Sequence, residues 1–434
     1  MNETICALAT APGGAIGIIR ISGDLSLEIL SRIFSKDLTN VSPNTIHYGC
    51  ILTPSPIGEG RGEALDEVLV SVFKSPHSYT GENSAEISCH GSRYILQQVL
   101  DLLCQNGCRM AHPGEFTMRA YLNGKMDLSQ AEAVADLIAS TNKVTHQMAM
   151  SQLRGHFSSE LSRLREKLLK LTSLLELELD FSDHEDLEFA DRSELLTLAR
   201  DIDTRVVRLA ESFQTGNALK NGIPVAIIGA PNVGKSTLLN ALVGEERAIV
   251  SDIQGTTRDA IEDTIELGGI TFRFIDTAGI RHTDDTVENL GIERSMAAAQ
   301  RARIILLMTE PGVPYPDVTL RKDQTVIRIE NKTEAFQAKY GIGLDTLRQQ
   351  LIDAAPHTDD SDIIVTSARQ YEALTHAQEN LQRVLEGLDQ QISGDLLSED
   401  LRLVLGNLAE ITGDGQITPQ ETLNNIFSHF CVGK

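Results

Sequence analysis

Short apolar runs separated by turn residues dominate the first 120 residues of the chain. Residues 15–21, 68–73 and 85–89 form such runs, and each is followed within a few residues by glycine or proline. Residues 95–103 instead carry apolar side chains at helical spacing. Short β-like runs mixed with an amphipathic helix predict an α+β domain over residues 1–120.

The spacing of apolar residues changes to three- and four-residue steps from Leu128 onward. Glycine and proline become rare, and the pattern predicts long amphipathic helices that include residues 128–138 and 161–179. A similar helical pattern covers residues 374–388 and 401–411 and ends at Gly413. These two segments predict an all-α domain in two parts, residues 121–219 and residues 371–434.

Residues 220–370 separate the two helical segments and have a third pattern. Short β-branched runs alternate there with helical stretches, which is typical of an α/β nucleotide-binding domain. The predicted fold is therefore multidomain: an α+β N-terminal domain and an all-α helical domain, with an α/β domain inserted into the helical one.

Composition limits the classes of function. A chain of 434 residues with 41% hydrophobic and 23% charged residues is long enough for two to four folded domains. The net charge of −23 argues against a broad surface that grips phosphate backbones, and the absence of tryptophan argues against a base-stacking platform. Residues 1–125 carry only −3 of this charge, so the acidic residues lie mainly in the rest.

The cysteines and the N-terminus indicate the cellular compartment in which the protein is expected. Six cysteines without a CxxC spacing favour ordinary thiols over zinc ligands. The N-terminus has no basic and apolar leader, and no apolar run approaches the roughly 20 residues of a membrane span. We therefore expect a cytoplasmic protein that does not enter a membrane.

A phosphate-binding loop follows the predicted strand at residues 224–229. The sequence GAPNVGKS has the GxxxxGK[ST] pattern, and it lies between a strand and a helix as that motif requires. Gly229 and Gly234 allow backbone N–H groups to surround a phosphate. Lys235 would reach the β- and γ-phosphates, and the Ser236 hydroxyl would bind Mg2+.

Three further motifs follow in the order that GTPases use. They are a polar loop with hydroxyls at Thr256 and Thr257, a DTAG motif after a predicted strand, and an NKxD-like motif at residues 331–334. Together with the phosphate loop they predict a GTPase rather than an ATPase. The residues expected to contact GTP are Asn232, Val233, Gly234, Lys235, Ser236, Thr237, Ser251, Gly255, Thr256, Thr257, Asp276, Thr277, Ala278, Gly279, Asn331, Lys332, Glu334, Gln337, Ala338 and Lys339.

Three features depart from the usual GTPase pattern. Ile280 stands where small signalling GTPases carry a water-orienting glutamine, and Glu334 replaces the aspartate that pairs with guanine. The SAK-like sequence at residues 337–339 follows Glu334 after only two residues, where a helix and a strand are normally found. Residues 367–369 are a second SAK candidate, although they lack a following glycine pair and open a helical pattern.

These motifs, taken with others along the chain, resemble the MnmE (TrmE) type of tRNA modification GTPase. The resemblance covers nearly everything except residues 308–362. It rests on GTTRD at 255–259, DTAGIR to NLGIERS at 276–295, IRISG at 19–23, SYTGEN at 78–83, HGS at 90–92, PGEFTMRAYLNGKMDLSQAEAV at 113–134 and IFSHFCVGK at 426–434.

The resemblance implies ion and catalytic sites in the GTPase domain. Ser236 and Thr257 match the family's Mg2+ ligands, and Asn232 with Ser251, Ile253 and Thr256 matches its K+ site. Glu288 matches the family's water-orienting glutamate, which would compensate for Ile280. Lys235 and Glu288 are thus the expected catalytic residues of GTP hydrolysis. A K+ ion there would take the place of an arginine finger.

The resemblance also implies a folate site in the N-terminal domain. Arg20, Glu82, Lys125 and Lys434 match the family's folate-contacting positions, for 5,10-methylene- or 5-formyl-tetrahydrofolate. Cys431 matches the tail cysteine, expected near the folate as a catalytic nucleophile or a positioning group. A purely structural role for Cys431 stays equally open.

The implied function is K+-dependent GTP hydrolysis in tRNA modification. A homodimer formed through the N-terminal domain would work with the flavoprotein MnmG (GidA), which alone carries FAD, in a heterotetramer or larger complex. Together they would add an aminomethyl or carboxymethylaminomethyl group at C5 of the wobble uridine, position 34, with tRNA held mainly by the partner. The alternatives are a GTP-regulated ribosome or RNA assembly factor, and a folate-dependent aminomethyl transferase with a regulatory GTPase domain.

Overall fold

The computed structural model describes residues 3–53, 62–180, 192–245, 263–275, 296–356, 362–413, 420–428 and 430–433. The chain divides into two compact units. One is formed by Met1–Ala135 with Ala409–Lys434, and the other by Asp136–Leu408. Among the described residues, no helix is long and apolar enough to cross a membrane.

The first unit contains a six-stranded, mostly antiparallel sheet of order β3-β4-β5-β2-β1-β6. The runs expected to be strands at 15–21, 68–73 and 85–89 are confirmed as β2, β4 and β5. The strands are β1 (Ile5–Leu8), β2 (Ile16–Ser22), β3 (Thr45–Leu52), β4 (Ala64–Phe73), β5 (Ser84–His90) and β6 (Arg109–Met110).

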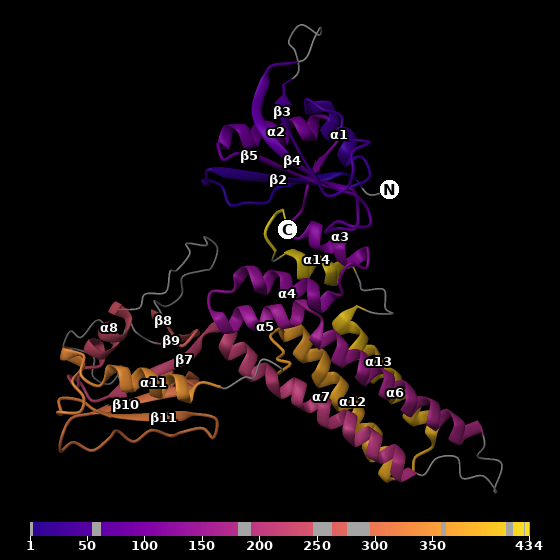
Figure 1. The fold of residues 1–434 in the computed structure, drawn as a ribbon. Helices are drawn as coiled ribbons and strands as arrows, with labels where there is room; N and C mark the ends of the chain where they lie inside the picture. Colours follow the sequence, from indigo (N-terminus) through magenta and orange to yellow (C-terminus); the bar gives the residue numbers. More distant parts are fainter. Residues whose placement is uncertain are drawn as a thin grey trace. The chain divides into compact units, whose positions relative to one another are not determined.

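Helices α1 (Ser26–Ile33) and α2 (Arg93–Gln105) pack on one face of this sheet (Figure 1). Alternate strand residues such as Ile19, Val70 and Ile87 point into that core. Since side chains alternate between the two faces of a strand, Arg20 and its neighbours on β5 face the other side. Near β1 this second face is also covered, since Ile5 and Ala7 are buried in a cluster with Phe116. Toward β3 and β4 it carries exposed residues such as Tyr48 and Leu69.

Further helical segments lie in the described part of the first unit. They are α3 (Glu115–Leu122), the start of α4 (Leu128–Ala139) and α14 (Gln420–Ser428). Leu128, Phe427 and Phe430 share one apolar cluster, which packs the C-terminal segment against the start of α4. The chain can pass this closely because Gly114 has no side chain: a Cβ there would lie 2.7 Å from the Phe427 carbonyl oxygen.

The helical part of the second unit confirms the long amphipathic patterns. Helices α7 and α12 pack along each other, α6 packs on α7, and Arg383 on α12 bonds Asp400 on α13 at 2.9 Å (Figure 1). The helices are α5 (Lys143–Leu153), α6 (His156–Asp180), α7 (Arg192–Asn221), α12 (Ala368–Asp389) and α13 (Gly394–Thr412).

The α/β part of the second unit is a five-stranded sheet of order β11-β10-β7-β9-β8. Strand β8 is antiparallel to β9, and the other pairings are parallel. Separate apolar clusters cover the two faces. The elements are β7 (Ile223–Gly229), α8 (Lys235–Glu245), β8 (Asp263–Leu267), β9 (Ile270–Phe274), β10 (Ile304–Thr309), β11 (Thr325–Glu330), the 3-10 turn η1 (Ala338–Tyr340) and α11 (Leu344–Ala354).

Candidate functional site

The phosphate loop joins the central strand β7 to helix α8. Two of its residues have a left-handed backbone, Asn232 with φ 61° and Gly234 with φ 97°. A Cβ at Gly234 would lie 2.5 Å from Asn331 Nδ2, and one at Gly229 would lie 2.6 Å from the Met308 carbonyl oxygen. A side chain at either position would therefore clash with residues at the ends of the neighbouring strands, even when no ligand is bound.

Lys235 lies folded over the loop that precedes it. Its Nζ donates hydrogen bonds of 2.8 Å to the carbonyl oxygens of Gly229 and Ala230. Burial lowers the pKa of Lys235 below its usual value. The ammonium group is thus placed where the loop's backbone N–H groups would hold a phosphate, and an anion there would offset its desolvation.

Asn331 connects the phosphate loop to the SAK-like turn. Its Nδ2 donates to the Val233 carbonyl oxygen at 2.8 Å, and its Oδ1 accepts from the Ala338 N–H at 3.1 Å. The side chain is 4% exposed, so both bonds are shielded from water. This arrangement joins residues 337–339, rather than 367–369, to the phosphate loop. Ser367 instead lies at the N-cap of α12.

The segment from Asn331 to Gly343 is short and tightly folded. Thr333 N–H donates to the Phe336 carbonyl at 3.1 Å, and Gln337 N–H donates to Ile342 at 3.0 Å. Among the described residues of this segment, η1 is the only helical or strand element longer than a bridge. Because no strand follows β11 here to pair with it, β11 is the edge strand of the sheet. A single turn therefore takes the place of the helix and strand that usually lie between these motifs.

The charged side chains of this segment differ in their surroundings. Lys332, with a left-handed φ of 63°, forms an ion pair with Glu310 at the end of β10. Glu334 is exposed, and Lys339 Nζ lies 5.6 Å from the centre of the Tyr340 ring. Sequence reasoning missed Glu310, because nothing in the order of motifs connects β10 to the NKxD-like segment.

Ser236 and Thr237 lie in the first turn of α8, whereas ten other residues predicted for the nucleotide and ion sites lie outside the described residues. They are Ser251, Ile253, Gly255, Thr256, Thr257, Asp276, Thr277, Ala278, Gly279 and Glu288. The predicted folate contact Lys434 also lies outside them. The roles of all these residues stay predictions.

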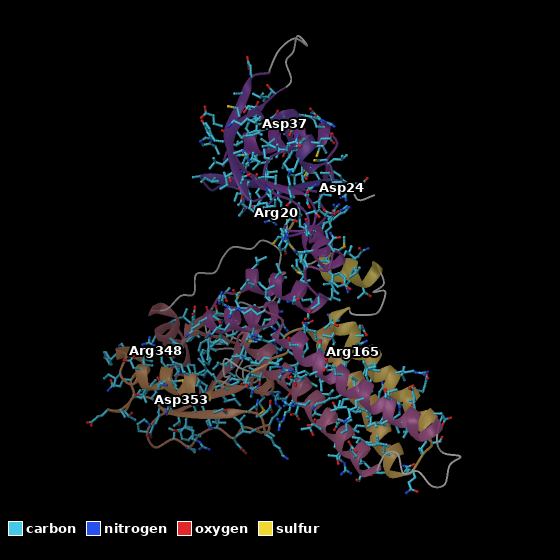
Figure 2. The ribbon with its side chains drawn as sticks, turned by 45° about the vertical axis from the view of Figure 1, so that its right-hand side comes forward. Arg20, Asp24, Asp37, Arg165, Arg348 and Asp353 are labelled. Atoms are coloured by element: carbon cyan, nitrogen blue, oxygen red, sulfur yellow. The ribbon has the colours of Figure 1, made fainter. Side chains whose placement is uncertain are left out.

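Arg20 on β2 is the centre of a second polar site, in the first unit (Figure 2). Its Nε and Nη2 donate to Glu86 Oε1 at 3.0 and 2.7 Å, and its Nη1 donates to the Gly433 carbonyl at 3.2 Å. The guanidinium carbon lies 5.5 Å from the Tyr79 ring centre and 5.6 Å from that of Phe116. The C-terminal tail is thus held beside Arg20.

Glu82 forms a buried ion pair. Its Oε2 lies 3.1 Å from Arg119 Nη1 and accepts a hydrogen bond of 2.8 Å from the Ser22 hydroxyl. Arg119 also bonds Glu115 at 2.9 Å. Sequence reasoning named Glu82 but not Arg119, although Arg119 lies inside the PGEFTMRAYLNGK motif. A ligand role for Glu82 would therefore also involve Arg119.

Lys125 and Cys431 lie at the edges of this site. Lys125 Nζ donates to the Pro76 carbonyl at 2.9 Å, and both groups are exposed. Cys431 is exposed, and its carbonyl accepts from Gly114 N–H at 3.4 Å. A pocket of about 80 Å³ opens beside Arg20. Its lining residues are Arg20, Phe73, Tyr79, Thr80, Ser84 and Glu86.

Comparison with known proteins adds to this geometry. The family described as "GTP-binding protein TrmE N-terminus" matches residues 4–125, and the family described as "MnmE helical domain" matches residues 128–431. The tRNA modification GTPase MnmE of Phocaeicola vulgatus is 52% identical over 495 aligned positions, which cover 100% of this chain and 99% of that protein. The chain belongs to the MnmE family of tRNA modification GTPases.

Other MnmE proteins match over the same extent. That of Bacteroides fragilis strain YCH46 is 53% identical with complete coverage of both chains, and that of Porphyromonas gingivalis is 47% identical with 98% of its length covered. The B. fragilis alignment runs over 473 positions, more than the 434 residues here, so this chain carries deletions relative to that protein. The multidomain fold predicted from the sequence is confirmed.

Glu115 gives the first unit a testable pH dependence. Burial opposes its ionisation, but hydrogen bonds from Arg109, the His112 N–H and Arg119 outweigh burial and bring the pKa of Glu115 to about 2. Because the folded-state pKa lies below the ordinary value of 4.5, the stabilisation is complete above that value and is lost as the pH falls toward 2.

We therefore expect Glu115→Gln to destabilise this unit most at neutral pH. The difference in unfolding free energy between wild type and variant should shrink as the pH falls from about 5 to about 2.5. Denaturant unfolding at a series of pH values measures it. A difference that stays constant across that range would contradict the assigned role of Glu115.

Proposed function

We propose that the site formed by the phosphate loop and the Asn331 turn binds GTP and hydrolyses it in a K+-dependent manner. The contact of Asn331 with both Val233 and Ala338 carries this proposal, because it brings the phosphate end and the base end of a nucleotide site into one unit. Membership of the MnmE family supports GTP rather than ATP as the nucleotide.

The residues present suit the two implied cations. Ser236 and Thr257 would hold Mg2+ through hydroxyl oxygens, while Asn232 with Ser251, Ile253 and Thr256 would offer amide, hydroxyl and backbone oxygens to K+. Asn232 is exposed within the phosphate loop, where its side chain is accessible to an ion. Bound K+ supplies positive charge beside the transferring phosphoryl group. Lys235 would hold the β- and γ-phosphate oxygens, and Glu288 would orient the attacking water.

Turnover in different salts tests the cation assignment. We expect GTP hydrolysis by the full chain to be at least about tenfold faster in K+ than in Na+ at equal ionic strength, since one fixed positive charge stabilises the transition state. Asn232→Ala should reduce that ratio, whereas Asn217→Ala, on α7, should leave it unchanged. Equal rates in the two salts would contradict the K+ mechanism.

We propose that the Arg20 site binds the one-carbon donor tetrahydrofolate. Arg20 and Lys125 would pair with its carboxylates, and Glu82 with the pterin edge, together with Lys434 and near Cys431. The rings of Tyr79 and Phe116 beside Arg20 support a flat ligand there. Exposed Cys431 would lie near the folate, because Gly433 is bonded to Arg20.

Replacement of the guanidinium tests the folate site. Arg20→Met should weaken binding of 5-formyl-tetrahydrofolate by about tenfold or more, the effect of losing one charged pair from a partly buried site. Arg32→Met, which removes an exposed arginine on α1, is the matched control and should bind as the wild type does. Unchanged affinity in the Arg20 variant, measured by calorimetric titration, would show that the ligand does not use this residue.

We propose that a homodimer forms through the exposed part of the N-terminal sheet face that carries Arg20. Ile16, Ile46, Tyr48 and Leu69 are between 47% and 67% exposed on β2, β3 and β4, an apolar surface suited to a second copy. Sedimentation should give a dimer, and Tyr48→Lys with Leu69→Lys should give a monomer. A wild-type monomer at micromolar concentration would contradict this proposal.

We propose that the dimer acts with MnmG, the flavoprotein that carries FAD, on the wobble uridine at position 34 of tRNA. GTP hydrolysis would accompany addition of the aminomethyl or carboxymethylaminomethyl group at C5, in the cytoplasm. The net charge of −23 supports tRNA contact mainly through the partner. Nucleoside analysis of cells lacking this chain should show loss of the modified uridine, and its persistence would contradict the assignment.

A further inference from the structure

Helix α5 contacts the hairpin formed by β8 and β9. The hairpin turns at Gly268 and Gly269, whose φ angles of 60° and 79° are those of a type I′ turn. The Val144 N–H of α5 donates to the Gly269 carbonyl at 3.3 Å. A Cβ at Gly269 would lie 3.0 Å from the Cβ of Lys143, so the helix and the turn are in van der Waals contact.

Asn142, the N-cap of α5, adds a buried polar contact to this junction. Its Oδ1 accepts from the Thr145 N–H at 2.8 Å, and its Nδ2 donates to Thr271 Oγ1 on β9 at 2.8 Å. The residue is 8% exposed. Separation of the helix from the hairpin would remove the partner of a shielded amide, so intermediate positions are unfavourable. The contact is expected to be either made or broken.

The position of the hairpin in the chain connects it to the nucleotide site. Its five residue pairs, from Asp263↔Phe274 to Leu267↔Ile270, hold β8 and β9 as one piece. Strand β8 follows the segment that contains Thr256 and Thr257, and β9 ends two residues before Asp276. Chain connectivity would therefore pass a change at either predicted nucleotide-binding segment to the same hairpin, and through it to α5.

The other end of α5 is fixed to the helical bundle. Gln152 Nε2 donates to Gln370 Oε1 at 3.1 Å, and the two side chains are 4% and 0% exposed. Gln370 lies in the first turn of α12. Between these ends, Val144 and Met148 pack against the core of the α/β sheet. An 11-residue helix of about 16 Å thus spans from the hairpin to α12.

We propose that α5 is a rigid link that couples the nucleotide state to the helical bundle, with Asn142 and Thr271 as its positioning residues. The inference rests on the proposed binding of GTP, and it names the path by which that binding reaches the helices. Since coupling between sites is reciprocal, a molecule that binds the bundle and shifts α5 changes GTP affinity by the same factor.

The rate of amide hydrogen exchange at the start of α5 measures this coupling. The amides of Val144 and Thr145 are protected by Gly269 and Asn142, so their exchange reports whether the contact is made. In the full chain, we expect exchange of a peptide covering residues 142–148 to differ about fivefold between GDP and a non-hydrolysable GTP analogue. Mass spectrometry measures this difference.

Substitutions at Thr271 provide the test. Thr271→Val removes the hydroxyl and should reduce the nucleotide-dependent difference to less than about twofold, with GTP affinity kept within about twofold. Thr271→Ser keeps the hydroxyl and should restore the difference. Thr325→Val, on the far edge of the same sheet, is the matched control and should behave as the wild type.

The outcomes separate this inference from the proposed function. If GTP binds but exchange at residues 142–148 is the same in both nucleotide states, or if Thr271→Val keeps the full difference, the coupling through α5 is wrong while GTP binding stands. If neither nucleotide binds, the proposed function and the coupling are both wrong.

Discussion

Replacement of Asn331 by alanine is expected to lower the affinity of the chain for GTP by at least about 100-fold, equivalent to about 2.7 kcal/mol. The amide holds the Val233 carbonyl of the phosphate loop and the Ala338 N–H of the SAK-like turn at the same time. Its loss leaves two shielded backbone groups without their partner and releases the base end from the phosphate end.

Two other variants make the Asn331 result specific. Asn331→Asp keeps an acceptor for Ala338 but loses the donor to Val233, so its affinity should fall between those of wild type and Asn331→Ala. Asn380→Ala removes an amide bonded to Asn407 in the helical part, and should bind GTP normally. Titration with a fluorescent GTP analogue measures all three. Near wild-type affinity in a folded Asn331→Ala chain would exclude residues 331–339 from the site.

Replacement of Arg119 by methionine is expected to lower the unfolding free energy of the N-terminal unit by about 3–5 kcal/mol. Arg119 is the shared partner of Glu82 and Glu115, and the three side chains are 7%, 9% and 5% exposed. Methionine fills a similar volume but removes this cation from both shielded carboxylates, while Arg109 still pairs with Glu115. The cost is that of reduced compensation of buried charge rather than of lost packing.

An exposed arginine supplies the control for Arg119. Arg163→Met removes a pair with Glu160 in which the arginine is 74% exposed, and such pairs contribute at most about 1 kcal/mol. Native-state hydrogen exchange of the β2 and β5 amides measures the stability of the N-terminal unit separately from the rest of the chain. Equal effects of the two substitutions would show that the buried pairs of Arg119 do not stabilise this unit.

Much of the fold could be predicted because its determinants are local. The alternating runs around β2, β4 and β5 and the helical periodicity of α6, α12 and α13 are set by burial of one face. The phosphate loop was equally predictable, since its glycines and lysine are adjacent in sequence. The order of the GTPase motifs then identified the inserted α/β domain.

The contacts that assemble the sites could not be predicted in this way. Arg20 meets Gly433 across 413 residues, and Asn142 meets Thr271 across 129. The choice between residues 337–339 and 367–369 also stayed open in the sequence, because letters alone do not show which turn Asn331 reaches. Long-range hydrogen bonds depend on how elements pack, and the pattern of one segment carries no information about its distant partner.

Calorimetric titration of the full chain with non-hydrolysable GTP and ATP analogues, in K+ and Mg2+, tests the central claim most directly. Residues 331–339 would form hydrogen bonds with guanine that adenine, with its different donors and acceptors, cannot form equally well. We therefore predict that the GTP analogue binds at least about 100-fold more tightly than the ATP analogue. Equal affinities for the two nucleotides would contradict the assignment of this shortened domain as a guanine-specific GTPase.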